Sequence, residues 1–312
     1  MEITFWAMFN QMTGLFALLL IGYSMNRLGL LPEHTEEVLS RLVTKLFLPA
    51  LTIYTFMEEC TVENLRTYGS WVVYGTMFVG ASILLAILLA KLMARKNSYL
   101  EGIYRYVLAF PNTGGVGTPV VLALFGTAGL FQYQLFQLLN GIATYGWGIV
   151  QMIPNPPARK WTDHVKNICN PVFVSTAIGA VLGLTGAIRY LPPVVPSTLQ
   201  TIGGAYSVLA MLLVGFVLGD YQVKDMVNGR PFYVVSLLRL LAIPCLYLAV
   251  LRLLHAPHML CVMTCLVYAC PCGMNTVVYP AAYGQDTRPG ASMILISSAL
   301  SMVTIPCIYM LL

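Results

Sequence analysis

Uncharged apolar runs recur along the whole chain, and each is about as long as one membrane crossing. An α-helix needs about 20 apolar residues to cross the ~30 Å hydrocarbon core of a bilayer. Between Arg105 and Arg159 there is no Asp, Glu, Lys or Arg, so this run is long enough for two crossings that turn at residues 126–129. The pattern predicts ten spans, the first a retained helix rather than a signal peptide, over residues 6–26, 36–57, 68–92, 103–125, 130–153, 170–188, 197–219, 231–253, 259–284 and 290–311.

Composition and the positions of Lys and Arg support this interpretation and give the spans a direction. Only 9% of the residues are charged and 58% are hydrophobic, whereas soluble domains have about 25% charged residues. Basic connections stay in the cytoplasm. With the N-terminus outside, the basic residues on cytoplasmic connections are Arg27, Lys91, Arg95, Lys96, Arg105, Arg159, Lys160, Lys166, Lys224, Arg230 and Arg288, and those outside are only Arg66, Arg189 and Arg252. We therefore expect an integral protein of the cell (inner or plasma) membrane with both termini outside, whose net charge of +5 reflects sidedness rather than nucleic acid binding.

An odd number of spans in each half reverses the second half relative to the first. The connection at residues 154–169 divides the ten spans into five and five, so we predict two repeats, 1–153 and 170–312, joined by a cytoplasmic linker. Inverted repeats of this kind are typical of secondary transporters. The predicted fold class is thus an all-α polytopic membrane protein built as a 5+5 inverted repeat.

The fourth span of each half contains the same combination of proline, glycine, asparagine and threonine. The two segments read FPNTGGVGTP at residues 110–119 and PCGMNTVVYP at residues 271–280. Proline removes a helix hydrogen bond and glycine permits an unwound backbone, which a membrane tolerates only where it is buried in protein or lines a polar cavity. Half-helix N-termini then present amide donors to an anion. The candidate substrate-binding residues are Pro111, Asn112, Thr113, Gly114, Gly115, Gly117, Pro119, Pro271, Cys272, Gly273, Asn275, Thr276 and Pro280.

Polar residues in other spans are further candidates. Gln137 and Asn140 of the fifth span either line the cavity or hydrogen-bond between packed helices. Arg239 lies inside the eighth span, where it is a counter-charge near the anion path, an anchor for the surrounding helices, or a side chain that reaches the cytoplasmic surface. For Arg41 and Lys45 in the second span we favour side chains that reach the membrane surface.

The motifs resemble those of the auxin efflux carrier family, which includes plant auxin exporters and bacterial malate and malonate permeases. FPNTGGVGTPVV, ACPCGMNTVVYPAAYGQD and RLVTKLFLPAL carry this resemblance, which covers nearly the whole chain. It implies a scaffold of spans 1, 2, 6 and 7, a mobile transport domain of spans 3–5 and 8–10 that moves like an elevator, and broken fourth and ninth helices that cross beside the substrate. It also implies a homodimer formed through the scaffold. The connection at 154–169 is much shorter than the hydrophilic loop of the plant members, so regulation through that loop is not expected.

Neither interrupted segment contains a carboxylate. Cation antiporters need an acidic residue at such a place, so the sequence favours a carrier of small organic anions, such as mono- or dicarboxylates or indole acids. Efflux is the favoured direction, because export of a monovalent anion gains about 2.3 kcal/mol per 100 mV of inside-negative potential. A sodium- or proton-coupled importer, a channel and a membrane sensor remain the alternatives. No paired acid, base or nucleophile indicates an enzyme, and neither a cofactor nor a metal site is expected.

Overall fold

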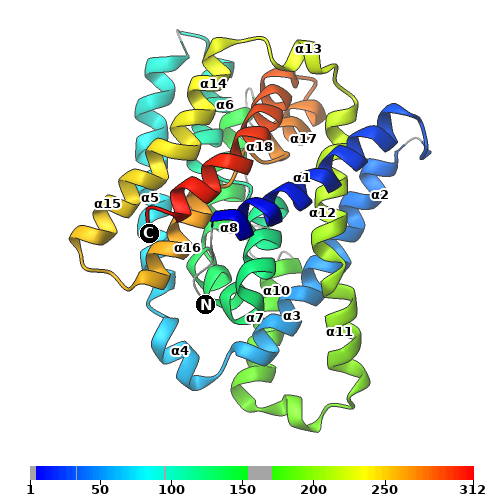
Figure 1. Ribbon diagram of the computed structural model, residues 1–312, viewed down its shortest axis with the longest axis vertical. Coiled ribbons are helices and arrows are strands. Elements are labelled where there is room, and N and C mark those ends of the chain that lie inside the picture. Colours follow the sequence, from blue (N-terminus) through cyan, green and yellow to red (C-terminus); the bar gives the residue numbers. More distant parts are fainter. Residues whose placement is uncertain (1–4, 33, 95, 154–170) are drawn as a thin grey trace.

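Helices make up the regular structure of the computed structural model, which describes residues 5–32, 34–94, 96–153 and 171–312. Within this part of the chain, seven helices are long and apolar enough to cross a membrane, and they lie side by side in one bundle (Figure 1). The predicted linker at 154–169 lies outside the described residues. The seven are Phe5–Arg27 (α1), Thr35–Glu59 (α2, η1 and α3), Val62–Met93 (α4 and α5), Thr113–Phe136 (η2 and α7), Val194–Gly219 (α11 and α12), Arg230–Leu253 (α14, η6 and α15) and Arg288–Tyr309 (α18).

Other predicted spans are divided into shorter helices or end early. The span predicted at 103–125 is split between α6 (Ser98–Ala109) and the start of the η2–α7 helix, and the one at 259–284 between α16 (His258–Tyr268) and α17 (Asn275–Ala282). The turn predicted at 126–129 is found at Gly126, whose φ of 63° and ψ of −160° are not helical. Three short pieces follow α7, namely α8 (Asn140–Ala143), η3 (Thr144–Gly148) and η4 (Ile149–Met152), and the remaining helices are α10 (Pro171–Thr185), η5 (Ala187–Tyr190) and α13 (Val223–Met226).

Three widened helical turns stand at the same distance before a proline. Each of three π-helical turns begins six residues before a proline. They are η1 (Val43–Phe47) before Pro49, η2 (Thr113–Gly117) before Pro119 and η6 (Leu238–Ala242) before Pro244. A proline has no amide to donate and its ring crowds the carbonyl four residues earlier. In a membrane, local π-helical adjustment re-satisfies the freed backbone groups, so these helices continue across their prolines.

Glycines allow two pairs of helices to pack closely. A methyl group at Gly22 in α1 would overlap the backbone of Leu212 in α12, and one at Gly215 in α12 would overlap that of Leu19 in α1. A methyl group at Gly179 in α10 would likewise lie 2.7 Å from the Cβ of Phe56 in α3. Small residues of this kind let membrane helices approach at backbone distance, so α1 with α12 and α3 with α10 form two tight pairs.

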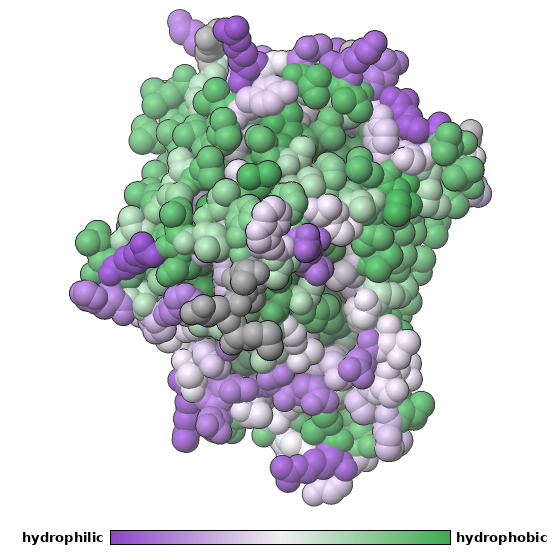
Figure 2. Space-filling view, viewed as in Figure 1, coloured by the Kyte–Doolittle hydropathy of each residue, from purple (hydrophilic) through white to green (hydrophobic). Residues whose placement is uncertain are grey.

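Polar contacts join the connections at each end of the bundle. At one end, Asn26 Nδ2 donates to Asp220 Oδ1 at 3.0 Å and the Tyr221 hydroxyl donates to Thr287 Oγ1 at 2.9 Å. At the other end, Thr127 Oγ1 donates to Glu59 Oε1 at 2.9 Å. Hydrophilic side chains gather mainly at these two ends, while hydrophobic ones cover the middle (Figure 2). The face in view therefore has the apolar middle zone that a membrane protein presents to lipid.

Candidate functional site

Two interruptions, between α6 and η2 and between α16 and α17, cross in the interior of the bundle. The amide of Asn112 donates to the carbonyl oxygen of Pro271 at 2.9 Å, and Pro111 and Cys272 form an isolated antiparallel bridge. The amide of Cys272 donates to Ser297 Oγ of α18 at 2.9 Å. These backbone groups, which the breaks remove from helices, are thereby satisfied inside the protein, as the membrane interior requires.

Each interruption is shorter than the sequence pattern suggests. Residues 110–112 and 269–274 are not helical, but the chain is helical from Thr113 onward and again from Asn275 onward. Pro119 stands inside the continuous helix of η2 and α7, just after the widened turn that accommodates it. Pro280 lies inside α17. The two prolines therefore shape helices beside the crossing rather than belonging to unwound backbone.

Asn112 is the N-cap of the helix that begins with η2. Its Oδ1 accepts a hydrogen bond from the amide of Gly115 at 2.9 Å, as expected of an asparagine cap. A methyl group at Gly115 would lie 2.7 Å from that same Oδ1, so only glycine leaves the cap room. Oδ1 is thus engaged as an acceptor, while the donor of this side chain, Nδ2, is buried and has no hydrogen-bond partner among the described residues.

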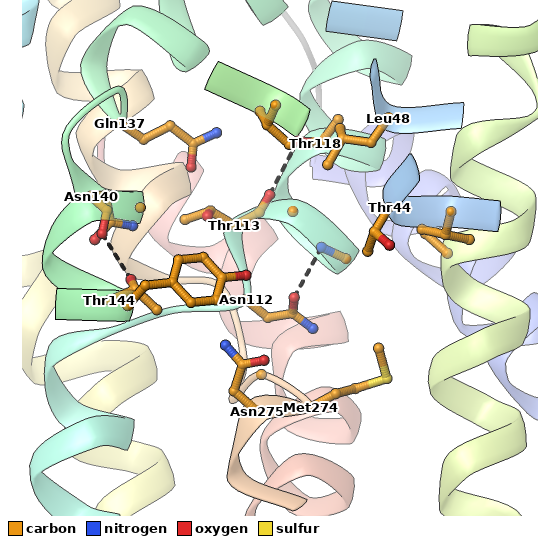
Figure 3. A pocket seen from close by; sticks show the side chains of 18 of the residues that line it. Thr44, Leu48, Asn112, Thr113, Thr118, Gln137, Asn140, Thr144, Met274 and Asn275 are labelled. Carbon is orange, nitrogen blue, oxygen red and sulfur yellow. Dashed lines mark hydrogen bonds between the residues drawn. The ribbon is translucent and has the colours of Figure 1, made fainter. Parts of the chain in front are cut away.

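Asn275 is the first residue of α17, and Met274 before it is the N-cap of that helix. Asn275 Nδ2 donates to the hydroxyl of Tyr106 in α6 at 2.7 Å, which leaves Asn275 Oδ1 as the group available to a ligand. Asn112 and Asn275 come from the two crossing segments and both face one cavity (Figure 3). The wall of that cavity therefore carries an unpartnered amide donor, buried just behind its surface, from one segment and an amide acceptor from the other.

The cavity beside the crossing has a volume of about 440 Å³, within the range of about 300–1,000 Å³ usual for ligand sites. The structure brings nine of the predicted residues to its wall. These are Pro111, Asn112, Thr113, Gly114, Gly115, Gln137, Asn140, Gly273 and Asn275. The predicted residues that do not line it are Gly117, Pro119, Pro271, Cys272, Thr276, Pro280 and Arg239.

Some predicted residues support the crossing from behind. Thr276 Oγ1 donates to the carbonyl oxygen of Gly273 at 2.8 Å and its side chain is fully buried. Gly117 lies against the hydroxyl of Tyr133, which a methyl group at this position would overlap. The Tyr133 hydroxyl in turn donates to the carbonyl oxygen of Thr113 at 3.2 Å. These residues fix the backbone of the cavity wall instead of contacting its contents.

Arg239 is fully buried, in the turn η6, and does not reach the membrane surface. Its Nη1 donates to the carbonyl oxygen of Leu108 at 3.0 Å and its Nε to that of Cys270 at 3.3 Å. Leu108 precedes the first interruption and Cys270 lies in the second. Of the interpretations that the sequence allowed, the structure thus excludes a side chain at the surface and places the guanidinium against the crossing.

Several lining residues were not among the sequence candidates. Lys45 and Thr44, in the turn η1, line the cavity, and Lys45 is at the same time exposed, so that its predicted reach to the membrane surface stays a prediction. The local sequence signal for these two residues is Pro49. It follows the start of the widened turn η1 by six residues, just as Pro119 follows the start of η2. Other polar and aromatic members of the wall are Ser40, Thr118, Gln134, Thr144, Thr176, Tyr106, Tyr145 and Tyr206.

Comparison with known proteins assigns the chain to a family. The family model described as "Membrane transport protein" matches residues 7–309. An uncharacterized transporter of Methanocaldococcus jannaschii is 24% identical over 294 residues, which cover 92% of this chain and 93% of that protein. An uncharacterized transporter of Methanothermobacter thermautotrophicus is 24% identical over 291 residues, 93% of each chain. The chain is therefore a membrane protein that belongs to this membrane transport protein family, the auxin efflux carrier family that its motifs resemble.

Proposed function

We propose that the protein is a secondary transporter that binds a small organic anion in the cavity beside the crossing and moves it across the cell membrane by alternating access. The observation that carries this proposal is the set of donors on the cavity wall. Asn112 Nδ2 is a fixed donor without a partner in the described structure. Thr113 and Gly114 are the first residues of a helix, so no preceding carbonyl of that helix can accept from their amides. A carboxylate placed here receives all of these donors together with the positive end of the helix.

The charges around the cavity favour the same ligand. Lys45 is on the wall, and none of the described lining residues is an Asp or a Glu. A carboxylate in the cavity is therefore attracted by Lys45 and repelled by no acidic side chain of the described wall. A cation would be repelled by Lys45 and would find no acidic partner there. The wall also contains four aromatic residues, Tyr106, Tyr145, Phe173 and Tyr206, which suit the organic part of such an anion.

The packing of the helices supports a division into two moving parts. The tight pairs of α1 with α12 and of α3 with α10 correspond to the spans that the family resemblance gives to a scaffold, and the crossing lies in the remaining helices. The cavity is lined from both parts, by Thr44 and Tyr206 on one side and by Asn112 and Asn275 on the other. A site between two such parts changes its access when they slide past one another, as in an elevator. We extend the proposal to a homodimer that is held together by the scaffold.

The position of the cavity supports loading from the cytoplasm. Its wall includes Ser40, in the second turn of the helix that starts at Thr35, and Pro171 at the start of α10. Both helices begin beside connections that carry the basic residues, and basic connections are cytoplasmic. The contact between Tyr221 and Thr287 joins two further connections of this group. With both termini outside, the cavity is then reached from the cell interior and the favoured direction is efflux.

A ligand screen followed by flux measurements tests the proposal. Purified protein is heated with a panel of monocarboxylates, dicarboxylates, indole acids and amino acids, and we expect acids alone to raise the melting temperature. The best acid is then loaded into proteoliposomes. Efflux that is accelerated by unlabelled acid on the opposite side identifies a carrier, because a channel gives no such acceleration. A protein that neither binds nor moves any acid of the panel contradicts the proposal.

Imposed membrane potentials test the direction. An uncoupled monovalent anion should leave faster from vesicles that are negative inside, since each 100 mV contributes about 2.3 kcal/mol per charge. An importer coupled to sodium or protons should instead require the corresponding gradient. Flux that ignores the potential and follows a sodium or proton gradient would replace efflux by coupled import.

A further inference from the structure

The carbonyl group that Arg239 contacts in α6 has lost its partner in the helix. The carbonyl of Leu108 would ordinarily accept from the amide of Asn112, four residues later. That amide donates to Pro271 instead. Arg239 Nη1 takes the vacant place at 3.0 Å. The hydrogen bond that closes the crossing therefore creates the acceptor that Arg239 satisfies.

Its second contact lies in the other interruption. Arg239 Nε donates at 3.3 Å to the carbonyl oxygen of Cys270, two residues beyond the end of α16. One guanidinium thus holds backbone from both broken segments, while Arg239 itself stands on a third element, η6. A guanidinium is suited to this task because its planar group has five donors in fixed directions.

The positive charge of Arg239 contacts backbone carbonyls through Nε and Nη1, while its buried Nη2 has no hydrogen-bond partner in the described structure. Its side chain is 0% exposed, and it forms no ion pair with any residue in the described parts of the chain. The groups it does contact are carbonyls at or just beyond the C-terminal ends of α6 and α16, and helix C-termini carry partial negative charge. The N-terminal ends of η2 and α17 face the cavity, so Arg239 holds the ends that the ligand does not use.

In transporters with broken helices, unwound carbonyls and half-helix C-termini are the groups that coordinate a coupling sodium ion or proton. Here two of these carbonyls are occupied by a side chain. We propose that Arg239 is a positioning residue that serves as a built-in counter-cation at the crossing, so that the two segments keep their register without a bound coupling cation. The absence of coupling rests on the proposed carrier function, whereas the role at the crossing does not.

Hydrogen exchange on the full-length protein tests the role at the crossing. Arg239→Met keeps a long side chain without the charge, and we expect exchange of the peptides that cover residues 106–118 and 268–278 to rise by about tenfold or more. Arg252→Met is the matched control, because Arg252 also donates to backbone carbonyls, those of Leu311 and Leu312, but far from the crossing. It should leave both peptides unchanged. Exchange in Arg239→Met equal to that of the unaltered protein overturns the proposal.

Chemical rescue separates a counter-cation from general packing. Arg239→Ala leaves space for a small ion, and added methylguanidinium should return exchange of the two peptides toward the original rate. Arg239→Met fills that space and should not respond. Failure of methylguanidinium to slow exchange in Arg239→Ala counts against a charge-specific role.

Sodium binding tests the second half of the proposal without a known substrate. Radioactive sodium should show no saturable binding to the unaltered protein, and Arg239→Ala should acquire it. Saturable sodium binding to the unaltered protein overturns the proposal. If no Arg239 variant folds, this measurement on the unaltered protein is sufficient to test it. A protein that moves no acid but shows the expected exchange pattern refutes the carrier function and retains the role of Arg239 at the crossing.

Discussion

The amide of Asn112 donates a hydrogen bond of 2.9 Å to the carbonyl oxygen of Pro271 and so joins two segments from opposite halves of the chain. The same residue caps η2 through its side chain. Asn112 therefore links the crossing to the helix whose first amides face the cavity. Its backbone bond survives any substitution except proline, whereas its cap and its free Nδ2 depend on the side chain.

Asn112→Ala should lower both stability and ligand binding. Loss of an N-cap costs about 0.5–2 kcal/mol of stability, and loss of the free Nδ2 should weaken binding of the best acid by about tenfold or more. Asn97→Ala is the matched control, because Asn97 caps α6 with the same bond, from the amide of Leu100 to its Oδ1 at 3.1 Å. Melting curves and binding isotherms check both. Equal loss of binding in the two variants would show that only stability matters.

Tyr106→Phe should weaken binding through Asn275. The Tyr106 hydroxyl holds Asn275 Nδ2 at 2.7 Å, and without it the amide can turn away from the cavity. Tyr247→Phe is the control, since the Tyr247 hydroxyl is also buried and pairs with Ser82 Oγ at 2.6 Å. Each change should cost about 0.5–1.5 kcal/mol of stability. Only Tyr106→Phe should raise the dissociation constant of the acid, and a similar rise in Tyr247→Phe contradicts this role.

The paired proline and glycine segments could be found from the sequence because their chemistry is local. A proline or a glycine changes the backbone wherever it stands in an apolar span, so the residues around both interruptions could be identified without any knowledge of packing. The extent of unwinding could not be inferred. Whether Pro119 breaks a helix or lies inside one depends on whether the turn before it widens, and the sequence pattern alone does not give the conformation of that turn.

Lys45 shows what the sequence pattern leaves open. Membrane helices are apolar on nearly every side, so hydrophobic periodicity gives little information on which side faces a cavity. Lys45 is exposed, as a lysine that reaches the membrane surface would be, and its place on the cavity wall depends on other helices that contact η1, among them α10 and α12. The contacts of Arg239 with both interruptions could not be predicted from the sequence either. Leu108 and Cys270 accept through backbone carbonyls, which every residue has.

Gly117→Ala should destabilise the protein by about 1–3 kcal/mol, the usual cost of an overpacked core. The added methyl group would overlap the Tyr133 hydroxyl and lie 2.9 Å from Cys270 Sγ. Gly114→Ala is the control, since its methyl group would meet the Tyr206 hydroxyl at an ordinary 3.5 Å. Combining Gly117→Ala with Tyr133→Phe removes the overlapping oxygen and should recover part of the melting temperature. No recovery would place the strain elsewhere.

Asp286 should make stability depend on pH in acid. Hydrogen bonds from the Arg288 guanidinium and amide hold the pKa of the Asp286 carboxyl below its usual value. Because the folded pKa is lowered, the stabilisation is present above about pH 4, the unfolded pKa, and is lost as the pH falls through the folded pKa. The pair is exposed, so its contribution is under about 1 kcal/mol. The difference in melting temperature between the protein and Asp286→Asn should shrink below about pH 4, and a difference independent of pH contradicts the assignment.

Lys45→Gln should weaken binding of an acid without loss of stability. Lys45 is the charged residue on the described cavity wall, and it is exposed. An exposed charge contributes less than a buried one, so we expect a rise of about three- to tenfold in the dissociation constant. The effect should diminish in high salt, and Lys45→Arg should retain most of the affinity. Lys91→Gln, at the end of α5, is the matched control. Identical dissociation constants for Lys45→Gln and the unaltered protein would show that Lys45 is not part of the anion site. The proposed site would then consist of the N-terminus of η2 and Asn112 alone.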